Sequence, residues 1–303
     1  MRRVLIAAVL MLAACDAAPN DSILDIGGER PGDPATLAPS DLPAFFDCLR
    51  EHNATLISAH RGGRHDGLTE NSIENFEATL AHTPAFMETD IARTRDGVLV
   101  LMHDDTVDRT TNGSGDVSSM TAAQFQALRL RDYQGNVLAT SPPTLRQALD
   151  WADGKTVLEL DVKRGVSYED VAREVEAAGA MSRVIFITYS VDGASRIASI
   201  APHAMIYTTV RSVRDLDTLE RRGAELSNIV AWLGDEELDP SLAQSLNARG
   251  VEGRWGLFGR DPDFAAAAEA GVEGVSVNDP EGAYRAIDAA DGQDGYAAAQ
   301  CAR

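Results

Sequence analysis

Short apolar runs recur along most of this chain, and segments of helical character separate them. Runs of this kind, bounded by polar or glycine-containing turns, are typical of buried strands. The predicted strands are residues 55–59, 86–91, 98–102, 156–162, 184–188 and 204–208, with weaker candidates at 228–233, 251–255 and 274–277.

The boundaries of the intervening helices support this alternation. Ser167 is placed to cap a helix that ends at Gly179, and the helix over 240–249 stops before a glycine. Asp261-Pro262 is expected to open another helix, which Gly271 closes. About eight strands alternating with helices over roughly 260 residues predict one α/β domain, a TIM-like (β/α)8 barrel. An open doubly wound sheet is the alternative, but Gly-x-Gly-x-x-Gly does not follow the first strand.

One stretch interrupts the alternation. From about residue 104 to 143 no buried strand is predicted, and a polar turn over 109–115 precedes a helix that opens at Thr121. We therefore expect a small insertion after the strand that leads into His103-Asp104. It should lie on the rim of the barrel, where loops carry specificity.

The two strands before this insertion are joined by Arg95-Asp96-Gly97. Asp-Gly between two apolar runs is a strong signal for a β-hairpin. With Asp96 and Gly97 as the two loop residues, Arg95 pairs with Val98, and counting back pairs Asp90 with His103. A barrel in which both runs are parallel needs a longer return, and this alternative stays open.

The N-terminal residues are predicted to be a targeting segment. Arg2-Arg3 precede an apolar run from Val4 to Ala14, which is too short for an ordinary transmembrane helix because about 20 apolar residues are needed. Leu12-Ala13-Ala14-Cys15 resembles the lipobox of bacterial lipoproteins, in which the cysteine is lipidated. We expect a lipoprotein signal peptide over 1–15 with lipidation at Cys15, a plain secretory peptide being the alternative.

Residues 16–40 are rich in Pro, Gly, Asp and Ser and are predicted to form a flexible tether, with the barrel domain over 41–303. The chain is then exported and lipid-anchored to a bacterial membrane, facing the periplasm. Cys48 and Cys301 would lie in an oxidising compartment near the two ends of the domain, where we expect a disulfide. Two free thiols are the alternative.

The charge of the chain limits its partners. There are 27 basic and 47 acidic residues, which give a net charge of −20. Such a chain is a poor partner for nucleic acid or for an anionic membrane surface, so a lipid anchor is the only membrane contact expected. A phosphate substrate remains compatible, because a bound cation can invert the local field.

Two strands carry charged residues in alternation. Glu88 and Asp90 share one face of a predicted strand, and Glu159, Asp161 and Lys163 share one face of another. Charges are seldom buried unpaired, so three of them in a central barrel strand indicate a site, although an edge strand with a solvated face is the alternative. A set of oxygen ligands suits a hard cation such as Mg²⁺ or Ca²⁺.

Two histidines follow predicted strands at the same end as these carboxylates. His60 and His103 fit a general base and a general acid on either side of a phosphorus atom. Taken singly, each is more often a hydrogen-bonded structural residue. Arg61 suits a phosphate oxygen through its planar guanidinium.

Together these motifs resemble the glycerophosphodiester phosphodiesterase family over about residues 56–287. The motifs are His60-Arg61-Gly62, Glu70-Asn71-x4-Phe76, Glu88-x-Asp90, Asp96-Gly97, His103-Asp104-x4-Arg109-Thr110-Thr111, Pro143-Thr144-Leu145, Asp161-x-Lys163 and Gly274-x3-Asn278-Asp279-Pro280.

The resemblance implies a TIM-like barrel enzyme that uses one divalent cation, Mg²⁺ or Ca²⁺, and two histidines. It implies hydrolysis of small-molecule glycerophosphodiesters to glycerol 3-phosphate and an alcohol, with His60 as base and His103 as acid. Arg61 and Lys163 would bind the substrate phosphate. The metal ligands implied are Glu88, Asp90 and Asp161.

The chain departs from the family pattern at three places. Asp161 stands where the family usually has glutamate, so Glu159 is an alternative third ligand. Arg254-Trp255-Gly256-Leu257 replaces a strand that commonly has Trp-Thr-Val-Asn, which leaves one wall of the pocket undefined. Ser72 replaces a threonine after Glu-Asn.

Two other functions fit part of this pattern. A phospholipase D-like enzyme of the sphingomyelinase D type shares the paired histidines and Glu-x-Asp, and an aspartate as third ligand suits it. The His-Arg-Gly and Arg-Thr-Thr motifs favour the first hypothesis. A non-catalytic solute-binding lipoprotein is the second alternative, although every expected catalytic position is filled.

Overall fold

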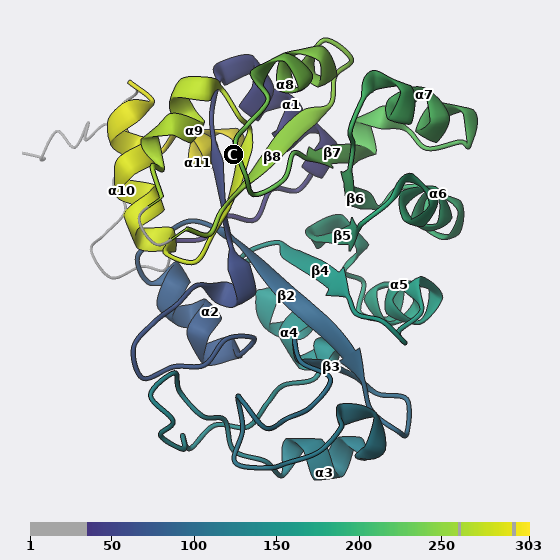
Figure 1. Cartoon of the computed structure of the whole chain (residues 1–303), viewed down its shortest axis with the longest axis vertical. Coiled ribbons are helices and arrows are strands. Elements are labelled where there is room, and N and C mark those ends of the chain that lie inside the picture. The colour runs from purple at the N-terminus through teal and green to yellow at the C-terminus, as the bar shows by residue number, and fades with distance from the viewer. Residues whose placement is uncertain (1–34, 260–261, 293–294) are drawn as a thin grey trace, which may run out of the picture. The chain divides into compact units, whose positions relative to one another are not determined.

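The computed structural model describes residues 35–259, 262–292 and 295–303, which form a closed barrel with helices outside the ring of strands (Figure 1). Parallel strands follow one another in the order β1-β9-β8-β7-β6-β5-β4-β2, and pairing of β1 with β2 closes the ring. The strands are β1 (Leu56–Ala59), β2 (Phe86–Arg93), β3 (Leu99–Leu101), β4 (Leu158–Val162), β5 (Val184–Thr188), β6 (Met205–Thr209), β7 (Ile229–Trp232), β8 (Glu252–Leu257) and β9 (Gly274–Val277). The predicted (β/α)8 barrel is confirmed.

The helices alternate with these strands and begin where capping residues predict. Ser167 accepts a hydrogen bond from the backbone of Asp170, and Thr144 forms a capping box with Gln147. The helices are α1 (Leu42–His52), α2 (Ile73–Leu80), α3 (Ala122–Gln126), α4 (Leu145–Ala152), α5 (Tyr168–Ala177), α6 (Val191–Ile200), α7 (Val213–Arg221), α8 (Pro240–Asn247), α9 (Ala265–Ala270), α10 (Pro280–Ala290) and α11 (Ala297–Cys301).

One predicted helix start differs from the structure. α9 begins at Ala265, after Phe264 at the N-cap. The predicted start at Asp261-Pro262 is therefore too early; of these two residues, Asp261 lies outside the described ranges. The end of α9 is as predicted, since Gly271 adopts the left-handed conformation (φ +66°) that a helix C-cap favours.

Helix α1 closes the end of the barrel at which the strands begin. Phe45 and Phe46 are 1% exposed and pack against Phe86, the first residue of β2. Phe46 also meets the ring of Tyr207 edge-on, with the ring centroids 6.2 Å apart. This aromatic plug leaves the opposite end, where the strands finish, for a functional site.

The hairpin between β2 and β3 has a different register from the one predicted. The strands are antiparallel and pair Ile91 with Leu101, and the backbone of Met102 donates to Asp90. The pairing of Asp90 with His103 is therefore wrong by one residue. The loop has one more residue than predicted, because Thr94 and Val98 close it and Gly97 adopts a φ of +88°.

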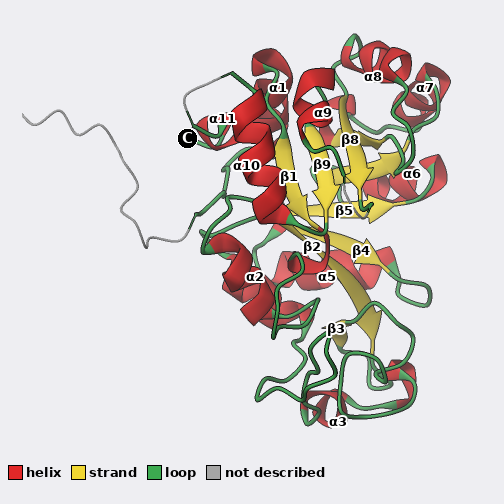
Figure 2. Cartoon of the chain, turned by 60° about the vertical axis from the view of Figure 1, so that its left-hand side comes forward, coloured by secondary structure: helices red, strands yellow, loops and turns green. Residues whose placement is uncertain are grey.

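The segment after β3 forms the predicted insertion on the barrel rim. It contains a short 3-10 helix (Val117–Ser119) and α3, and lies beyond the ends of β2 and β3 (Figure 2). A small hydrophobic cluster of its own holds it together, made of Val100, Met102, Val107, Val117 and Phe125. The insertion is thus a packed unit.

The described residues begin at Ala35. The predicted signal peptide, Cys15 and most of the predicted tether therefore lie outside them. The predicted end of the tether at residue 40 is wrong. Ala35 donates its backbone N–H to Leu80, and Leu37 is completely buried and forms a β-bridge with Thr156. Apolar side chains at 35 and 37 extend the packed domain to the first described residue. Within the described ranges, no helix has the length and apolar character needed to cross a membrane.

Cys48 of α1 and Cys301 of α11 form a disulfide, as predicted, with their Cα atoms 5.7 Å apart. β1 and β9 are neighbours in the closed ring, so the helices at the two ends of the domain come together. The bond links residues that are 253 positions apart in the sequence.

Replacing both cysteines, by Cys48→Ser with Cys301→Ser, should lower the free energy of unfolding by up to about 5 kcal/mol, because a very long loop in the unfolded chain is no longer closed. Denaturant unfolding of the oxidised wild type and the double variant measures this. The native double variant should retain its activity, since neither cysteine lines the strand ends. Two free thiols per denatured, unreduced wild-type chain that lacks the signal peptide with Cys15 would contradict the bond.

Candidate active site

The interior of the barrel contains a layer of polar side chains where apolar ones are usual. Ser58, Glu159, Tyr207 and Arg254, here called the polar layer, come from β1, β4, β6 and β8, which are alternate strands of the ring. Arg254 Nη2 lies 2.6 Å from Glu159 Oε2 and also donates to Ser58. Ser58 and Tyr207 donate to the two oxygens of Glu159 at 2.5 and 3.1 Å.

A second acidic group lies next to this layer, toward the ends of the strands. The parallel register of β2 and β4 pairs Glu88 with Glu159 and Asp90 with Asp161. Oxygens of Glu88, Asp90 and Asp161, here called the carboxylate cluster, lie within 4.8 Å of one another, and all three residues are buried. Glu159 is not part of this cluster because the polar layer engages both of its oxygens. The geometry therefore favours Asp161 over Glu159 as the third ligand.

Cations offset only part of the charge of the cluster. Lys163 Nζ lies 2.7 Å from Asp90 and 2.6 Å from Asp161. Although burial opposes it, the charges of Lys163 and Arg61 hold the pKa of Asp90 below its ordinary value. Burial, reinforced by the charges of Asp90 and Asp161, raises the pKa of Glu88 well above its ordinary value. The cluster thus favours a further positive charge beside Glu88.

The unpartnered oxygens of the cluster fit a divalent cation. Asp161 Oδ1 is buried and has no hydrogen-bond partner among the described residues, whereas Oδ2 accepts from Lys163 and Tyr189. Glu88 accepts one hydrogen bond through Oε2, from the backbone of Arg61 at 2.8 Å. A set of carboxylate oxygens suits Mg²⁺ or Ca²⁺ better than zinc.

Two strained backbone positions place Arg61 against the cluster. Arg61 and Asn71 adopt left-handed conformations, with φ of +54° and +56°, which are costly for residues other than glycine. Asn71 compensates by donating to Asp90 Oδ2 at 2.7 Å and accepting from the backbone of Asp90 at 3.0 Å. Gly62 follows Arg61 because a Cβ there would lie 2.3 Å from the ring of Phe76.

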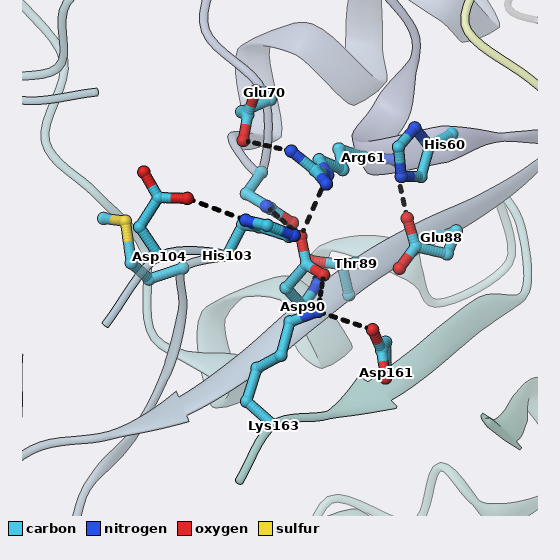
Figure 3. Close-up of polar contacts among 12 residues, drawn as sticks. His60, Arg61, Glu70, Glu88, Thr89, Asp90, His103, Asp104, Asp161 and Lys163 are labelled. Carbon is cyan, nitrogen blue, oxygen red and sulfur yellow. Dashed lines mark hydrogen bonds and ion pairs between the residues drawn. The ribbon is translucent and has the colours of Figure 1, made fainter. Parts of the chain in front are cut away.

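The two histidines lie on different sides of the cluster. Figure 3 shows His60 on the side of Glu88 and His103 on the side of Asp90. The His60 Nδ1–H donates to Asn278 Oδ1 at 2.8 Å, and the His103 Nδ1–H donates to Asp104 Oδ1 at 2.7 Å. Since these oxygens only accept, each ring has its Nε2 available for proton transfer.

Arg109 of the insertion holds Asp104, the hydrogen-bond partner of His103, in place. It donates to both oxygens of Asp104 and to both oxygens of Glu70, and Glu70 also pairs with Arg61 at 3.0 Å. Hydrogen bonds from Arg109 hold the pKa of Asp104 at about 2. The Arg-Thr-Thr motif therefore connects the insertion to both His103 and Arg61.

A cavity of about 180 Å³ adjoins the cluster on the His60 side. We call it the His60-side cavity, and its walls include His60, Glu88, Asp161, Trp232, Arg254 and Phe258. The wall that the sequence left undefined is aromatic. Gly256 makes it possible, because a Cβ there would lie 2.6 Å from Trp232 and 2.8 Å from Phe258.

Every residue that the sequence analysis assigned to catalysis, substrate binding or metal binding lies in this region; Cys15 lies outside the described residues. Five further residues contribute to the site without a role predicted from the sequence: Asn278, Asp104, Arg109, Glu70 and Tyr189. The first four stand in the quoted motifs, so their motif membership was the available signal. Tyr189 follows a predicted strand end directly, but an exposed tyrosine there carries no signal of its own.

The fold and the site together define a barrel enzyme of the hydrolase class. A family model described as the glycerophosphoryl diester phosphodiesterase family matches residues 60–282, and this chain belongs to that family.

Relatives and solved structures agree with this family assignment. A glycerophosphodiester phosphodiesterase of Caldanaerobacter subterraneus is 27% identical over 236 residues, covering 75% of this chain and 95% of the relative. The structure of a glycerophosphoryl diester phosphodiesterase from Parabacteroides distasonis has 32% identity and a TM-score of 0.76, covering 84% of this chain and 94% of that one. An Oleispira antarctica phosphodiesterase, solved in complex with the product sn-glycerol-3-phosphate, shares the fold at 19% identity and a TM-score of 0.63, covering 79% and 99% of the two chains.

The structure predicts different effects for the two neighbouring acids of β4. Asp161→Asn should weaken binding of Mg²⁺ or Ca²⁺ by at least about 10-fold, because it replaces an oxygen of the cluster that has no other partner. Glu159→Gln should lower thermal stability, since it leaves Arg254 without its carboxylate, but change metal affinity less. Titration calorimetry of each variant with both metals measures this. The reverse order of affinities would assign the third ligand to Glu159.

Proposed function

We propose that this chain hydrolyses glycerophosphodiesters to glycerol 3-phosphate and an alcohol, with one divalent cation, Mg²⁺ or Ca²⁺, and two histidines. The observation that carries the proposal is the buried carboxylate cluster with an available imidazole nitrogen on each side. The family supplies the reaction class. The product bound to the Oleispira antarctica phosphodiesterase supports glycerol 3-phosphate as the product.

Glu88, Asp90 and Asp161 would hold the cation, which when bound polarises the phosphoryl oxygen and stabilises negative charge in the transition state. Arg61 and Lys163 lie beside the same carboxylates, with Arg61 Nε 3.3 Å from Asp90. Their charges can turn to the non-bridging oxygens of a phosphate that reaches the cluster. They therefore orient the phosphate for attack.

His60 is suited to act as the base. Burial lowers the pKa of His60 below its ordinary value, against the effect of the hydrogen bond to Asn278. The ring is then neutral at pH 7, and Nε2 can accept a proton from the nucleophile. The nucleophile is either water or a neighbouring glycerol hydroxyl, which forms a cyclic phosphate first.

His103 is suited to act as the acid. Its Nδ1–H donates to Asp104, which fixes the orientation of the ring and leaves Nε2 available. Protonated His103 can then give the Nε2 proton to the departing alkoxide. In this mechanism the leaving alcohol would lie on the His103 side of the phosphorus atom.

Release of glycerol 3-phosphate from glycerophosphocholine tests this function. Activity should disappear with EDTA and return with Mg²⁺ or Ca²⁺. Turnover of intact lysophosphatidylcholine without turnover of glycerophosphocholine would instead support the sphingomyelinase D-like alternative. Binding of glycerophosphocholine with no turnover at saturating metal would support the solute-binding alternative.

The histidine variants test the mechanism in the same assay. His60→Ala and His103→Ala should each lower turnover by about 10²–10⁴-fold, the usual contribution of a general acid or base. His203→Ala is a matched control because that histidine lies far from the cluster in sequence and does not line the His60-side cavity. Either variant retaining more than a tenth of wild-type turnover at saturating metal would contradict the two-histidine mechanism.

We also propose that the chain is exported and lipid-anchored through Cys15 to a bacterial membrane, facing the periplasm. The basic-apolar-cysteine pattern of the first 15 residues supports this. Cys15→Ser should move the protein from the membrane fraction to the soluble fraction of fractionated cells and abolish labelling with a radioactive fatty acid. An unchanged distribution of the variant would rule out the anchor.

A further inference from the structure

The charged pair in the polar layer requires an explanation beyond stability. Glu159 is completely buried and Arg254 is 4% exposed. Their strands, β4 and β8, lie on opposite sides of the ring, so the ion pair crosses the interior. Apolar residues of similar volume are often as stabilising as a buried ion pair, and barrel interiors usually contain them.

The contacts of Arg254 show which hydrogen-bond donors of its guanidinium remain available. Nη2 engages Glu159 and Ser58, and the guanidinium lies 4.3 Å from the ring centroid of Tyr207 and 5.9 Å from that of Trp232. These contacts fix the orientation of the guanidinium. Nε and Nη1 have no hydrogen-bond partner among the described residues, and Nε is buried. Arg254 therefore has one accessible N–H donor group to spare, Nη1, in a residue that lines the His60-side cavity.

The cavity fits a small polar group with an apolar surface. Its volume of about 180 Å³ leaves room for a small polar group. Trp232 and Phe258 form a stacked aromatic wall, with ring centroids 6.3 Å apart. Glu88 and Asp161 on the same cavity oppose an anion, and Glu159 already neutralises Arg254. An uncharged hydroxyl oxygen is the acceptor that this environment favours.

We propose that Arg254 is a specificity-determining residue, which donates a hydrogen bond to the terminal hydroxyl of the glycerol group of the substrate. The inference rests on the proposed function. His60 lines this cavity, whereas His103 lines a separate one with Asp105 and Asp116. The leaving alcohol thus belongs to the His103 side, and the retained glycerol group to the His60 side. Arg254 lies in the layer next to the carboxylate cluster, so it meets the end of the glycerol group farthest from the phosphate.

Two substrates isolate this hydrogen bond. Glycerophosphocholine has the terminal hydroxyl, and 2-hydroxypropyl phosphocholine lacks it while keeping the hydroxyl beside the phosphoester carbon. The analogue therefore retains the nucleophile of a cyclic mechanism. The wild type should prefer glycerophosphocholine in kcat/KM by about 10–150-fold, the usual effect of a hydrogen bond from a charged donor.

Arg254→Met should remove that preference. For glycerophosphocholine, the kcat/KM of the variant should fall toward the wild-type value for the analogue. For the analogue, kcat/KM should change little. The variant leaves Glu159 buried without its cation, so the double variant Glu159→Gln with Arg254→Met removes both charges and keeps the fold testable. Arg254→Lys keeps a charge near Glu159 without the planar guanidinium and should lose most of the preference as well.

Arg50→Met is the matched control. Arg50 pairs with Glu252, a buried carboxylate of the same strand β8 that does not line the cavity. This variant should lower thermal stability but keep the preference between the two substrates.

The outcomes separate the inference from the proposed function. A wild type that hydrolyses neither substrate would overturn the proposed function, and the inference with it. A wild type that hydrolyses both with equal kcat/KM would overturn the inference alone. The same conclusion would follow if the double variant and Arg254→Lys both kept the wild-type preference.

Discussion

The repulsion among Glu88, Asp90 and Asp161 is the interaction on which the site depends. Three carboxylates within a few ångströms, buried from water, cannot all ionise without compensating positive charge. Lys163 and Arg61 supply part of it, both against Asp90. Among the described residues, Asp161 Oδ1 and one oxygen of Glu88 have no hydrogen-bond donor. The missing positive charge is therefore local, and it points to a place for a cation.

The surrounding structure can be understood as support for this charge arrangement. The left-handed backbone at Arg61 and Asn71 brings an N–H group to Glu88 and an amide to Asp90. Such conformations cost free energy and persist where neighbouring contacts hold them. Glu70, in the loop before α2, pairs with Arg61, and Arg109 of the insertion in turn holds Glu70. The insertion therefore contributes to the site even though it stands outside the barrel.

The net charge of the barrel interior matches the proposed cation and substrate. Four acids, Glu88, Asp90, Glu159 and Asp161, face three cations, Arg61, Lys163 and Arg254, which leaves one negative charge in excess. A divalent cation and a phosphodiester monoanion would together bring the interior to neutrality. The pair of Glu159 and Arg254 adds no net charge, and its effect is on shape and hydrogen bonding.

The sequence by itself determined the strand order along the chain, the insertion, the expected disulfide partners and the two strands, β2 and β4, that carry the acids of the site. Periodicity and motif spacing are local properties, and a parallel barrel brings the ends of all its strands to one side. Tertiary structure decided which acid of β4 joins the cluster, because only the cross-barrel contact with Arg254 removes Glu159 from it. It also decided the hairpin register, where one additional loop residue shifts every pair. The aromatic wall and the donors of Arg254 depend on strands distant in sequence, so no local pattern could reveal them.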